Sequence, residues 1–318
     1  MSNNSSCQSL SPTVYLSGYS IILTLGLFLN ITALWFFIVR LPSLRSPTKV
    51  YMKNLAFADF LLVCMLPLMI YQHAAPLGTD FENIRTLCIV AGTFLLLNMY
   101  GSIFLLACIS LDRCLALCFP LRSRSFRRFA PWFCAGVWML NLGACATLFF
   151  RHTSNSTDST NECFSSHPPV VTMRAPTIAS LLIGFLVPLG IMVVSSCSLL
   201  RAVSKSQSAQ DGTVNRRKLI HMLSANLAIF LFCFLPYHAV LLSYQIWERN
   251  CILQEAYKIA LLMACSNTVL DPIAYYFATE TMQKKIVEEK IRLAGGSGGE
   301  TEKNSNVNLL ARHKGTQA

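Results

Sequence analysis

The chain has 318 residues, of which 53% are hydrophobic and only 13% are charged, and its formal net charge is +11. Soluble domains carry roughly 25% charged residues, so this composition argues against a soluble globular protein. A basic excess can indicate nucleic-acid binding. Here the cations lie in short segments between long apolar runs, which argues against nucleic acid as a partner.

Seven apolar runs follow one another along the chain, and each is long enough to cross a membrane. About 20 helical residues span the hydrocarbon layer, and a helix satisfies its backbone N–H and C=O groups internally. Strands of a membrane barrel would alternate apolar and polar residues, and these runs do not. The seven predicted spans are Val14–Val39, Val50–Tyr71, Leu87–Leu117, Pro131–Phe150, Pro176–Leu200, Leu219–Ile246 and Tyr257–Ala278.

The segments between the spans predict the orientation of the chain. Lys and Arg gather in the first, third and fifth loops and in the tail, for example in the stretch 122–128. Cationic loops stay cytoplasmic, so we expect an extracellular N-terminus and a multi-pass protein of the plasma membrane. Glycosylation sequons at Asn3, Asn4 and Asn155 all fall on the predicted outer side.

These assignments divide the chain into four regions. Residues 1–13 form the extracellular N-terminus, and residues 14–278 form the membrane domain. Residues 279–293 predict an amphipathic helix on the membrane surface, and residues 294–318 a disordered cytoplasmic tail. The predicted fold class is all-α: a seven-transmembrane helix bundle with a short amphipathic eighth helix.

The cysteines agree with this topology. Four of the thirteen, Cys7, Cys88, Cys163 and Cys251, fall on the predicted outer, oxidising side. An even number there predicts two disulfides, and three pairings are open from the residues alone.

Polar residues inside the spans are candidates for function. An acid at the bilayer centre costs ~2.5–3.5 kcal/mol on insertion scales, and three acids, Asp59, Asp112 and Asp271, lie within the spans. Prolines, each of which removes a helix hydrogen bond, interrupt four of the spans at Pro67, Pro188, Pro236 and Pro272. A single-pass anchor or a passive bundle has no need of this many bends and buried acids.

These residues resemble the motifs of rhodopsin-like (class A) G-protein-coupled receptors. The motifs, in chain order, are Asn30, "NLAFAD" with Asp59, Cys88, Asp112-Arg113-Cys114, Trp138, Pro188, "FLFCFLPYH" from Phe230 to His238, and "DPIAY" from Asp271 to Tyr275. The resemblance implies a receptor rather than an enzyme. It also implies heterotrimeric G proteins as partners, with arrestin and receptor kinases acting on the tail.

The resemblance assigns roles to particular residues. Arg113 is expected to be the switch that an entering G protein takes over, with Asp112 holding it at rest. The other expected switch residues are Phe230, Phe234, Pro236, Asp271, Pro272 and Tyr275. The only cofactor implied is an allosteric sodium ion at Asp59, Ser102, Asn267 and Asp271, and a protonated, hydrogen-bonded Asp59 is the alternative. The implied disulfides are Cys88–Cys163 and Cys7–Cys251.

The ligand is predicted to be an anionic amphiphile. Leu95 stands where amine receptors carry an acid, and the third and sixth spans resemble lysophosphatidic acid receptors, while the third outer loop resembles G-protein-coupled receptor thirty-five. Lysophosphatidic acid or a related lysophospholipid is the first expectation, and an aromatic carboxylate or a nucleotide is the alternative. The candidate ligand residues are Arg174, Lys258, Arg151 and His238 for the anion and Leu95 and Met99 for the apolar part.

Two other classes of membrane protein are alternatives to a receptor. A secondary transporter would show inverted repeats and broken helices in matching halves, and the odd number of spans and the lack of an apparent repeat argue against it. An intramembrane aspartyl protease would use two facing acids, and Asp59 with Asp271 resembles such a pair. The Gly-x-Gly-Asp context of those enzymes is absent from the chain.

Overall fold

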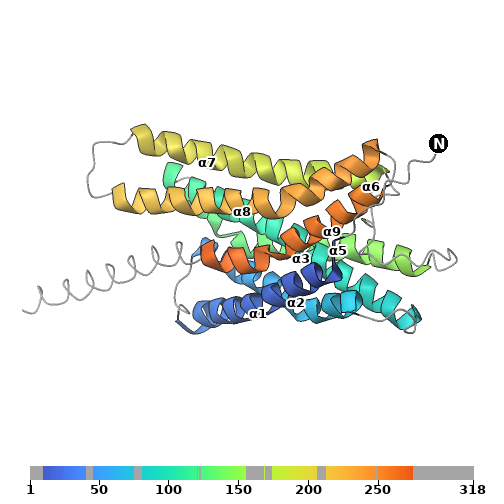
Figure 1. Ribbon diagram of the computed structural model, residues 1–318. Helices are drawn as coiled ribbons and strands as arrows, with labels where there is room; N and C mark the ends of the chain where they lie inside the picture. The colour runs from blue at the N-terminus through green and yellow to red at the C-terminus, as the bar shows by residue number, and fades with distance from the viewer. Residues whose placement is uncertain are drawn as a thin grey trace, which may run out of the picture. The chain divides into compact units, whose positions relative to one another are not determined.

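The structure is a computed structural model, and it describes most of the predicted membrane domain (Figure 1). The described residues are 10–40, 46–74, 81–119, 121, 123–154, 168, 174–205, 213–247 and 250–274. All regular elements within these ranges are helices. The amphipathic helix expected at 279–293 and the tail lie outside the described residues, as do the three predicted glycosylation sites.

The helices follow the predicted spans in order. They are α1 (Pro12–Trp35) with the π-helix η1 (Phe36–Arg40), α2 (Pro47–Ala74), α3 (Phe81–Cys118), α4 (Ser123–Arg127), α5 (Ala130–Ser154), α6 (Arg174–Ala179), the π-helix η2 (Ser180–Leu186), α7 (Val187–Lys205), α8 (Thr213–Ile246) and α9 (Cys251–Cys265). After a turn at Ser266, residues 267–274 are helical again. Elements α6, η2 and α7 together form the fifth span.

Six of these helical segments are long and apolar enough to cross a membrane. The seventh span is α9 with the helical residues 267–274. It begins at residue 251 rather than at the predicted 257, because the side chain of Asn250 accepts a hydrogen bond of 2.8 Å from the backbone N–H of Leu253. Such a cap satisfies one of the unpaired N–H groups of the first turn. With α9 and residues 267–274 counted as the seventh span, the expected seven-helix bundle is confirmed.

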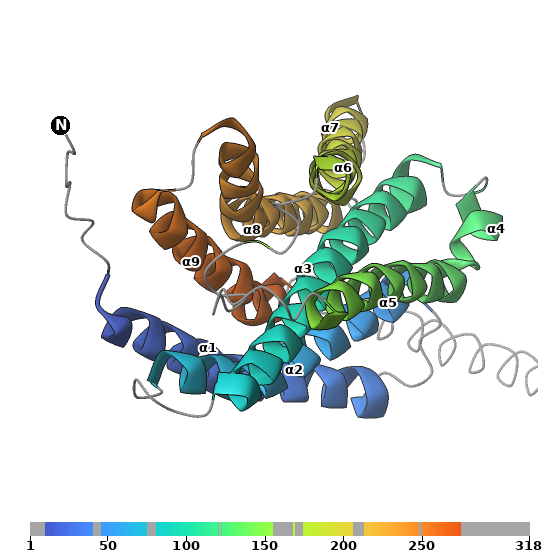
Figure 2. The ribbon, with the colours of Figure 1, turned by 90° about the vertical axis from the view of Figure 1, so that its right-hand side faces the viewer.

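Helix α3 is the centre of the bundle and packs against α2, α5, α7, α8 and α9. Figure 2 looks along the bundle and shows α3 running obliquely between α1 and α2 on one side and α7 and α8 on the other. In the span formed by α3, 72% of an apolar 18-residue stretch is buried. The corresponding fractions are 22% for the span that begins with α1 and 17% for α5. The outer helices therefore present apolar side chains such as Phe28, Trp132 and Met139 outward, as expected where lipid is the solvent.

Close approach of α1 to its neighbours depends on Gly26. A Cβ atom at Gly26 would lie 2.9 Å from Cγ2 of Val63 and 3.2 Å from Oγ1 of Thr268. Small residues let membrane helices approach in this way. One turn further on, the buried Asn30 donates from Nδ2 to the carbonyl of Thr268 at 2.7 Å. The Asn30 motif thus joins α1 to the seventh span.

Pro188 accompanies irregular helix geometry in the fifth span. The π-helix η2 ends two residues before Pro188. Because proline has no N–H, the carbonyl four residues before it loses its helical partner, and a wider turn accommodates this loss. Pro67 and Pro236 lie inside α2 and α8.

Candidate functional site

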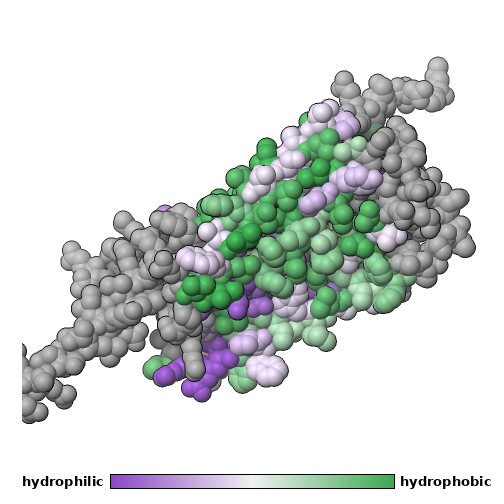
Figure 3. All heavy atoms as spheres, turned by 90° about the horizontal axis from the view of Figure 1, so that it is seen from below, coloured by the Kyte–Doolittle hydropathy of each residue, from purple (hydrophilic) through white to green (hydrophobic). Residues whose placement is uncertain are grey.

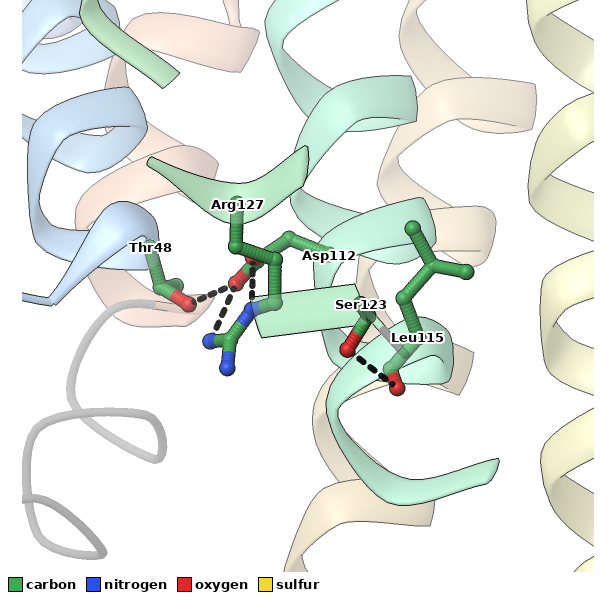
Figure 4. Close-up of polar contacts among 5 residues, drawn as sticks. All are labelled: Thr48, Asp112, Leu115, Ser123 and Arg127. Carbon is green, nitrogen blue, oxygen red and sulfur yellow. Dashed lines mark hydrogen bonds and ion pairs between the residues drawn. The ribbon is translucent and has the colours of Figure 1, made fainter. Parts of the chain in front are cut away.

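The carboxylate of Asp112 is held by residues from two other helices (Figure 4). Oγ1 of Thr48, in the first turn of α2, donates to Oδ2 of Asp112 at 2.5 Å. Arg127 at the end of α4 donates from Nε to Oδ1 at 2.7 Å and from Nη2 to Oδ2 at 3.3 Å. We call these three residues the Asp112 cluster. It joins α2, α3 and α4 at one end of the bundle.

The described hydrogen bonds to the Asp112 carboxylate come from Thr48 and Arg127, and the expected hold of Asp112 on Arg113 stays a prediction. Adjacent residues on a helix do not face each other, whereas Arg127 approaches the carboxylate from a separate helix. The Nε and Nη2 atoms of Arg113 are buried and have no hydrogen-bond partner among the described residues. A guanidinium with unsatisfied donors at the end of α3 is suited to accept a partner from outside the bundle.

A second feature fastens α4 to α3. Oγ of Ser123 donates to the carbonyl of Leu115 at 3.1 Å (Figure 4). Thr48, Ser123 and Arg127 were not among the residues expected to bond to α3. Thr48 and Arg127 are 64 and 15 positions from Asp112, and Ser123 is 8 positions from Leu115, which exceeds the three or four positions that bring side chains together on one helix. Their only visible signal was that all three are polar residues near the ends of predicted spans.

The polar residues predicted to hold sodium form one buried cluster in the middle of the bundle. Asp59, Ser102, Asn267 and Asp271 are all 0% exposed. Nδ2 of Asn267 donates to Oγ of Ser102 at 3.1 Å and lies 3.5 Å from Oδ1 of Asp59. The cluster has a fifth member, Asn98, whose Nδ2 donates to the same Asp59 oxygen at 2.9 Å. Asn98 precedes Ser102 by four residues on α3, so the two side chains lie on one face of the helix. This spacing could have identified Asn98 from the sequence.

Several oxygens of this polar cluster have no hydrogen-bond partner among the described residues. They are Oδ2 of Asp59, Oδ1 of Asn267 and both carboxylate oxygens of Asp271. Leaving a buried polar atom unpaired costs about 1–3 kcal/mol. Carboxylate and amide oxygens are also the ligands that hard cations prefer. The donor set therefore fits either an alkali cation or protonated acids.

The predicted switch residues of α8 belong to a stack of aromatic rings. Phe230 and Phe234 are both 0% exposed and meet edge to face at 5.7 Å. Phe185 of η2 stacks on Phe230 at 5.4 Å and on His238 at 4.4 Å. Pro236 lies within this stretch of α8 and Pro272 is buried in the seventh span, whereas Tyr275 lies outside the described residues.

His238 is a packing residue in this arrangement. It is 2% exposed, and its Nδ1 donates to the carbonyl of Phe234 at 2.8 Å. Leu95 and Met99, each 1% exposed, are likewise part of the core. None of these three predicted ligand residues is among those that line the cavities of about 1270 Å³ and about 450 Å³ formed by the described helices.

An apolar cavity of about 450 Å³ opens between α3, α5, α6 and η2. Leu96 and Tyr100 come from α3, Leu140 and Leu148 from α5, and Ile183 from η2. The Tyr100 hydroxyl is hydrogen-bonded to Oγ of Ser180, on the wall of the same cavity. We call this space the α3–α5 cavity. Its walls suit a single apolar chain better than a charged group.

The cations predicted to meet a ligand anion lie in different surroundings. Arg174, the first residue of α6, is exposed, and Pro176 in the same turn lines the α3–α5 cavity. Nζ of Lys258 instead donates to Oε1 of Glu255 at 2.8 Å, as an ion pair within α9. The side chain of Arg151 lies outside the described residues.

Glu255 is an organising residue that the sequence reasoning missed. Its Oε2 accepts from the hydroxyl of Tyr15 at 2.9 Å and from the backbone N–H of Leu10 at 3.4 Å. This carboxylate joins the start of α1 to α9.

Two of the four outer cysteines fall within the described residues. Cys88 in α3 and Cys251 at the start of α9 are each disulfide-bonded. Cys7 and Cys163 lie outside the described residues, so the pairing stays a prediction. The other nine described cysteines are free thiols.

Comparison with known proteins gives consistent matches over most of the chain. Residues 29–275 match the family described as 7 transmembrane receptor (rhodopsin family). Lysophosphatidic acid receptor 4 of Mus musculus is 37% identical over 281 residues, which cover 84% of this chain and 74% of that protein. Lysophosphatidic acid receptor 6 of Mus musculus is 35% identical over 303 residues (90% and 87%). G-protein coupled receptor 68 of Mus musculus is 31% identical over 290 residues (88% and 76%).

Proposed function

The chain belongs to the rhodopsin family of seven-transmembrane receptors, and from this premise we propose that its agonist is a lysophospholipid of the lysophosphatidic acid class. Family membership makes it a multi-pass membrane receptor rather than an enzyme, with a heterotrimeric G protein as its partner. Two of the relatives reported above are named for lysophosphatidic acid. The ligand, the orientation and the roles of individual residues are the proposed part.

The α3–α5 cavity and Arg174 together carry the ligand proposal. A lysophospholipid has one acyl chain and one anionic headgroup, so its site needs an apolar cavity beside a cation. The cavity is lined mainly by apolar side chains, and Arg174 begins the helix that forms one wall. A guanidinium pairs a phosphate in a bidentate manner. We assign the headgroup to Arg174 and the acyl chain to the cavity.

Among the predicted anion partners, Lys258 is a weaker candidate than Arg174. Its ammonium already donates to Glu255 at 2.8 Å, and Glu255 in turn holds Tyr15 at 2.9 Å. A phosphate would have to compete with this carboxylate for the same cation. Arg174 has no ion pair with any described residue.

The test is a concentration–response measurement of G-protein activation by lysophosphatidic acid at matched surface expression. A charge-assisted hydrogen bond contributes about 1.5–3 kcal/mol, so Arg174→Ala should weaken the agonist roughly ten- to hundredfold. Lys258→Ala, which removes an equal charge, should have a smaller effect. Shortening the acyl chain should cost ~0.8 kcal/mol per methylene. A response to nucleotides or aromatic carboxylates, with none to lysophospholipids, would contradict the ligand assignment.

Activation is proposed to proceed through Arg113. Its unpaired Nε and Nη2 donors are suited to carbonyls of a G-protein helix that enters at this end of the bundle. Phe185 of η2 stacks on Phe230, which in turn meets Phe234. These rings would pass a displacement of η2 at the ligand cavity to α8. Arrestin and receptor kinases are proposed as further partners, acting on the tail.

A sodium ion is proposed as an allosteric cofactor in the polar cluster of Asp59, Ser102, Asn267 and Asp271. The unpaired oxygens of Asp59, Asn267 and Asp271 support it, because each needs a cation or a proton. Sodium should lower agonist affinity, and Asp59→Asn should weaken this effect. If sodium leaves agonist affinity of the parent receptor unchanged, the acids are protonated instead.

We also propose that the N-terminus is extracellular, with disulfides Cys88–Cys163 and Cys7–Cys251 and glycans on Asn3, Asn4 and Asn155. The disulfide bonding of Cys88 and Cys251 supports this orientation, because disulfides persist on the oxidising side. Peptide mapping without reduction should recover both linked pairs and the glycans. A peptide that links Cys7 to Cys163 would contradict the pairing.

A further inference from the structure

A second cavity lies at the end of the bundle that holds the Asp112 cluster, and it shares no lining residue with the α3–α5 cavity. Its volume is about 1270 Å³, and it opens between the end of α1, the beginning of α2, α4 and the beginning of α5. We call it the α1–α4 cavity. Nothing in the proposed activation by a lysophospholipid uses it.

This cavity has two chemically different parts. Leu34, Ile38 and Phe57 form an apolar part, and Ile38 and Phe57 are 53% and 46% exposed. The other part is basic, and its cations are Lys49, Lys53, Arg124, Arg127 and Arg128. No acidic residue is among the described side chains that line the cavity. Figure 3 shows a largely hydrophobic face with hydrophilic side chains gathered towards one end.

We propose that the α1–α4 cavity binds a polyphosphoinositide of the cytoplasmic leaflet. The apolar part comes from α1, η1 and α2, which belong to the membrane spans Pro12–Val39 and Pro47–Tyr71, so the occupant must reach hydrocarbon. The basic part requires several negative charges in a small volume. A phospholipid with a multiply phosphorylated headgroup meets both needs, and basic pockets at the cytoplasmic ends of membrane helices suit such headgroups. The proposal rests on the orientation proposed above.

Arg127 connects this lipid site to the Asp112 cluster. A guanidinium has five N–H donors. The Arg127 guanidinium uses only those on Nε and Nη2 to bond to Asp112. The remaining donors of Arg127 are available to a phosphate in the cavity that this side chain lines. A bound headgroup would therefore hold α4 through Arg124, Arg127 and Arg128 while the Asp112 pairing stays in place. The lipid should stabilise the docked position of α4.

The test uses the full-length purified receptor in phosphatidylcholine nanodiscs, with its thermal unfolding as the readout. Adding phosphatidylinositol bisphosphate should raise the melting temperature more than adding the same mole fraction of phosphatidylserine. The double variant Lys53→Gln/Arg128→Gln removes two exposed charges of the cavity. Each cation near such a lipid contributes about a fivefold gain in affinity, so the apparent affinity should fall about thirtyfold.

The matched control is Arg201→Gln/Lys205→Gln, which removes two charges from α7, a helix that contributes none of the described residues lining the cavity. It should bind the lipid as the parent receptor does. Equal losses in both double variants, or equal stabilisation by phosphatidylserine, would overturn the proposal. Soluble inositol trisphosphate tests whether the cavity binds a lipid or a free inositol phosphate. It should stabilise the receptor less than the lipid does. Equal stabilisation would assign the cavity to a free inositol phosphate. The unfolding experiment contains no lysophosphatidic acid, so a negative result would overturn the lipid site and would not bear on the proposed agonist.

Discussion

The pairing of Asp112 with Arg127 predicts a measurable coupling between these two side chains. Asp112 is 5% exposed and accepts two hydrogen bonds from Arg127. Replacing Arg127 with Gln removes the charge and the fork of donors, while Thr48 remains bonded to the carboxylate at 2.5 Å. The carboxylate is then left in a poorly hydrated position with one partner instead of two.

The size of the effect follows from the geometry. Hydrogen bonds to charged groups contribute about 1.5–3 kcal/mol each, but the side chain of Arg127 is 25% exposed, so water replaces part of the loss. We therefore expect a loss of about 1.5–3 kcal/mol for the pair rather than twice that. At about 2–4 °C per kcal/mol for a large chain, this corresponds to a fall in melting temperature of roughly 3–12 °C.

A double-mutant cycle in nanodiscs, followed by thermal unfolding, measures this coupling. Asp112→Asn and Arg127→Gln should each destabilise the receptor, and the double variant should lose much less than the sum. Arg128→Gln, a neighbouring exposed arginine with no bond to Asp112, is the control and should be additive with Asp112→Asn. A negligible coupling of Asp112 to Arg127, together with a strong coupling to Arg113, would refute the reasoning.

Three further predictions concern single positions. Arg113→Ala should abolish G-protein activation at matched surface expression, and unchanged signalling would contradict its role as the switch. Gly26→Ala should cost about 1–3 kcal/mol, because its Cβ would lie 2.9 Å from Val63, whereas Gly136→Ala, with nothing within 4 Å, should not destabilise the receptor. Glu255→Gln should destabilise the receptor by about 1–2 kcal/mol in thermal unfolding, because it removes the charge that accepts hydrogen bonds from Lys258 and Tyr15, and an unchanged melting temperature would contradict its role in joining α1 to α9.

The sequence by itself determined the fold class and the family of this protein. Apolar runs of span length leave few alternatives, because unsatisfied backbone groups in lipid exclude other structures. Motifs such as Asp112-Arg113 and the run from Asp271 mark the family because each side chain is unusual in a membrane helix. The burial of Asp59 and Asp271 also followed from their positions in the middle of apolar runs.

Only the tertiary structure decided which side chains meet. Asp112 pairs with Arg127, fifteen positions away on another helix, although an arginine stands next to it in the chain. Glu255 neutralises Lys258 and holds Tyr15, which weakens Lys258 as a ligand residue and leaves Arg174 beside the α3–α5 cavity. Helix periodicity specifies a face of each helix, but the partner of that face depends on how the helices pack. Helix packing brings residues that are distant in the chain together, and the local sequence pattern of one helix does not predict which other helix it will contact.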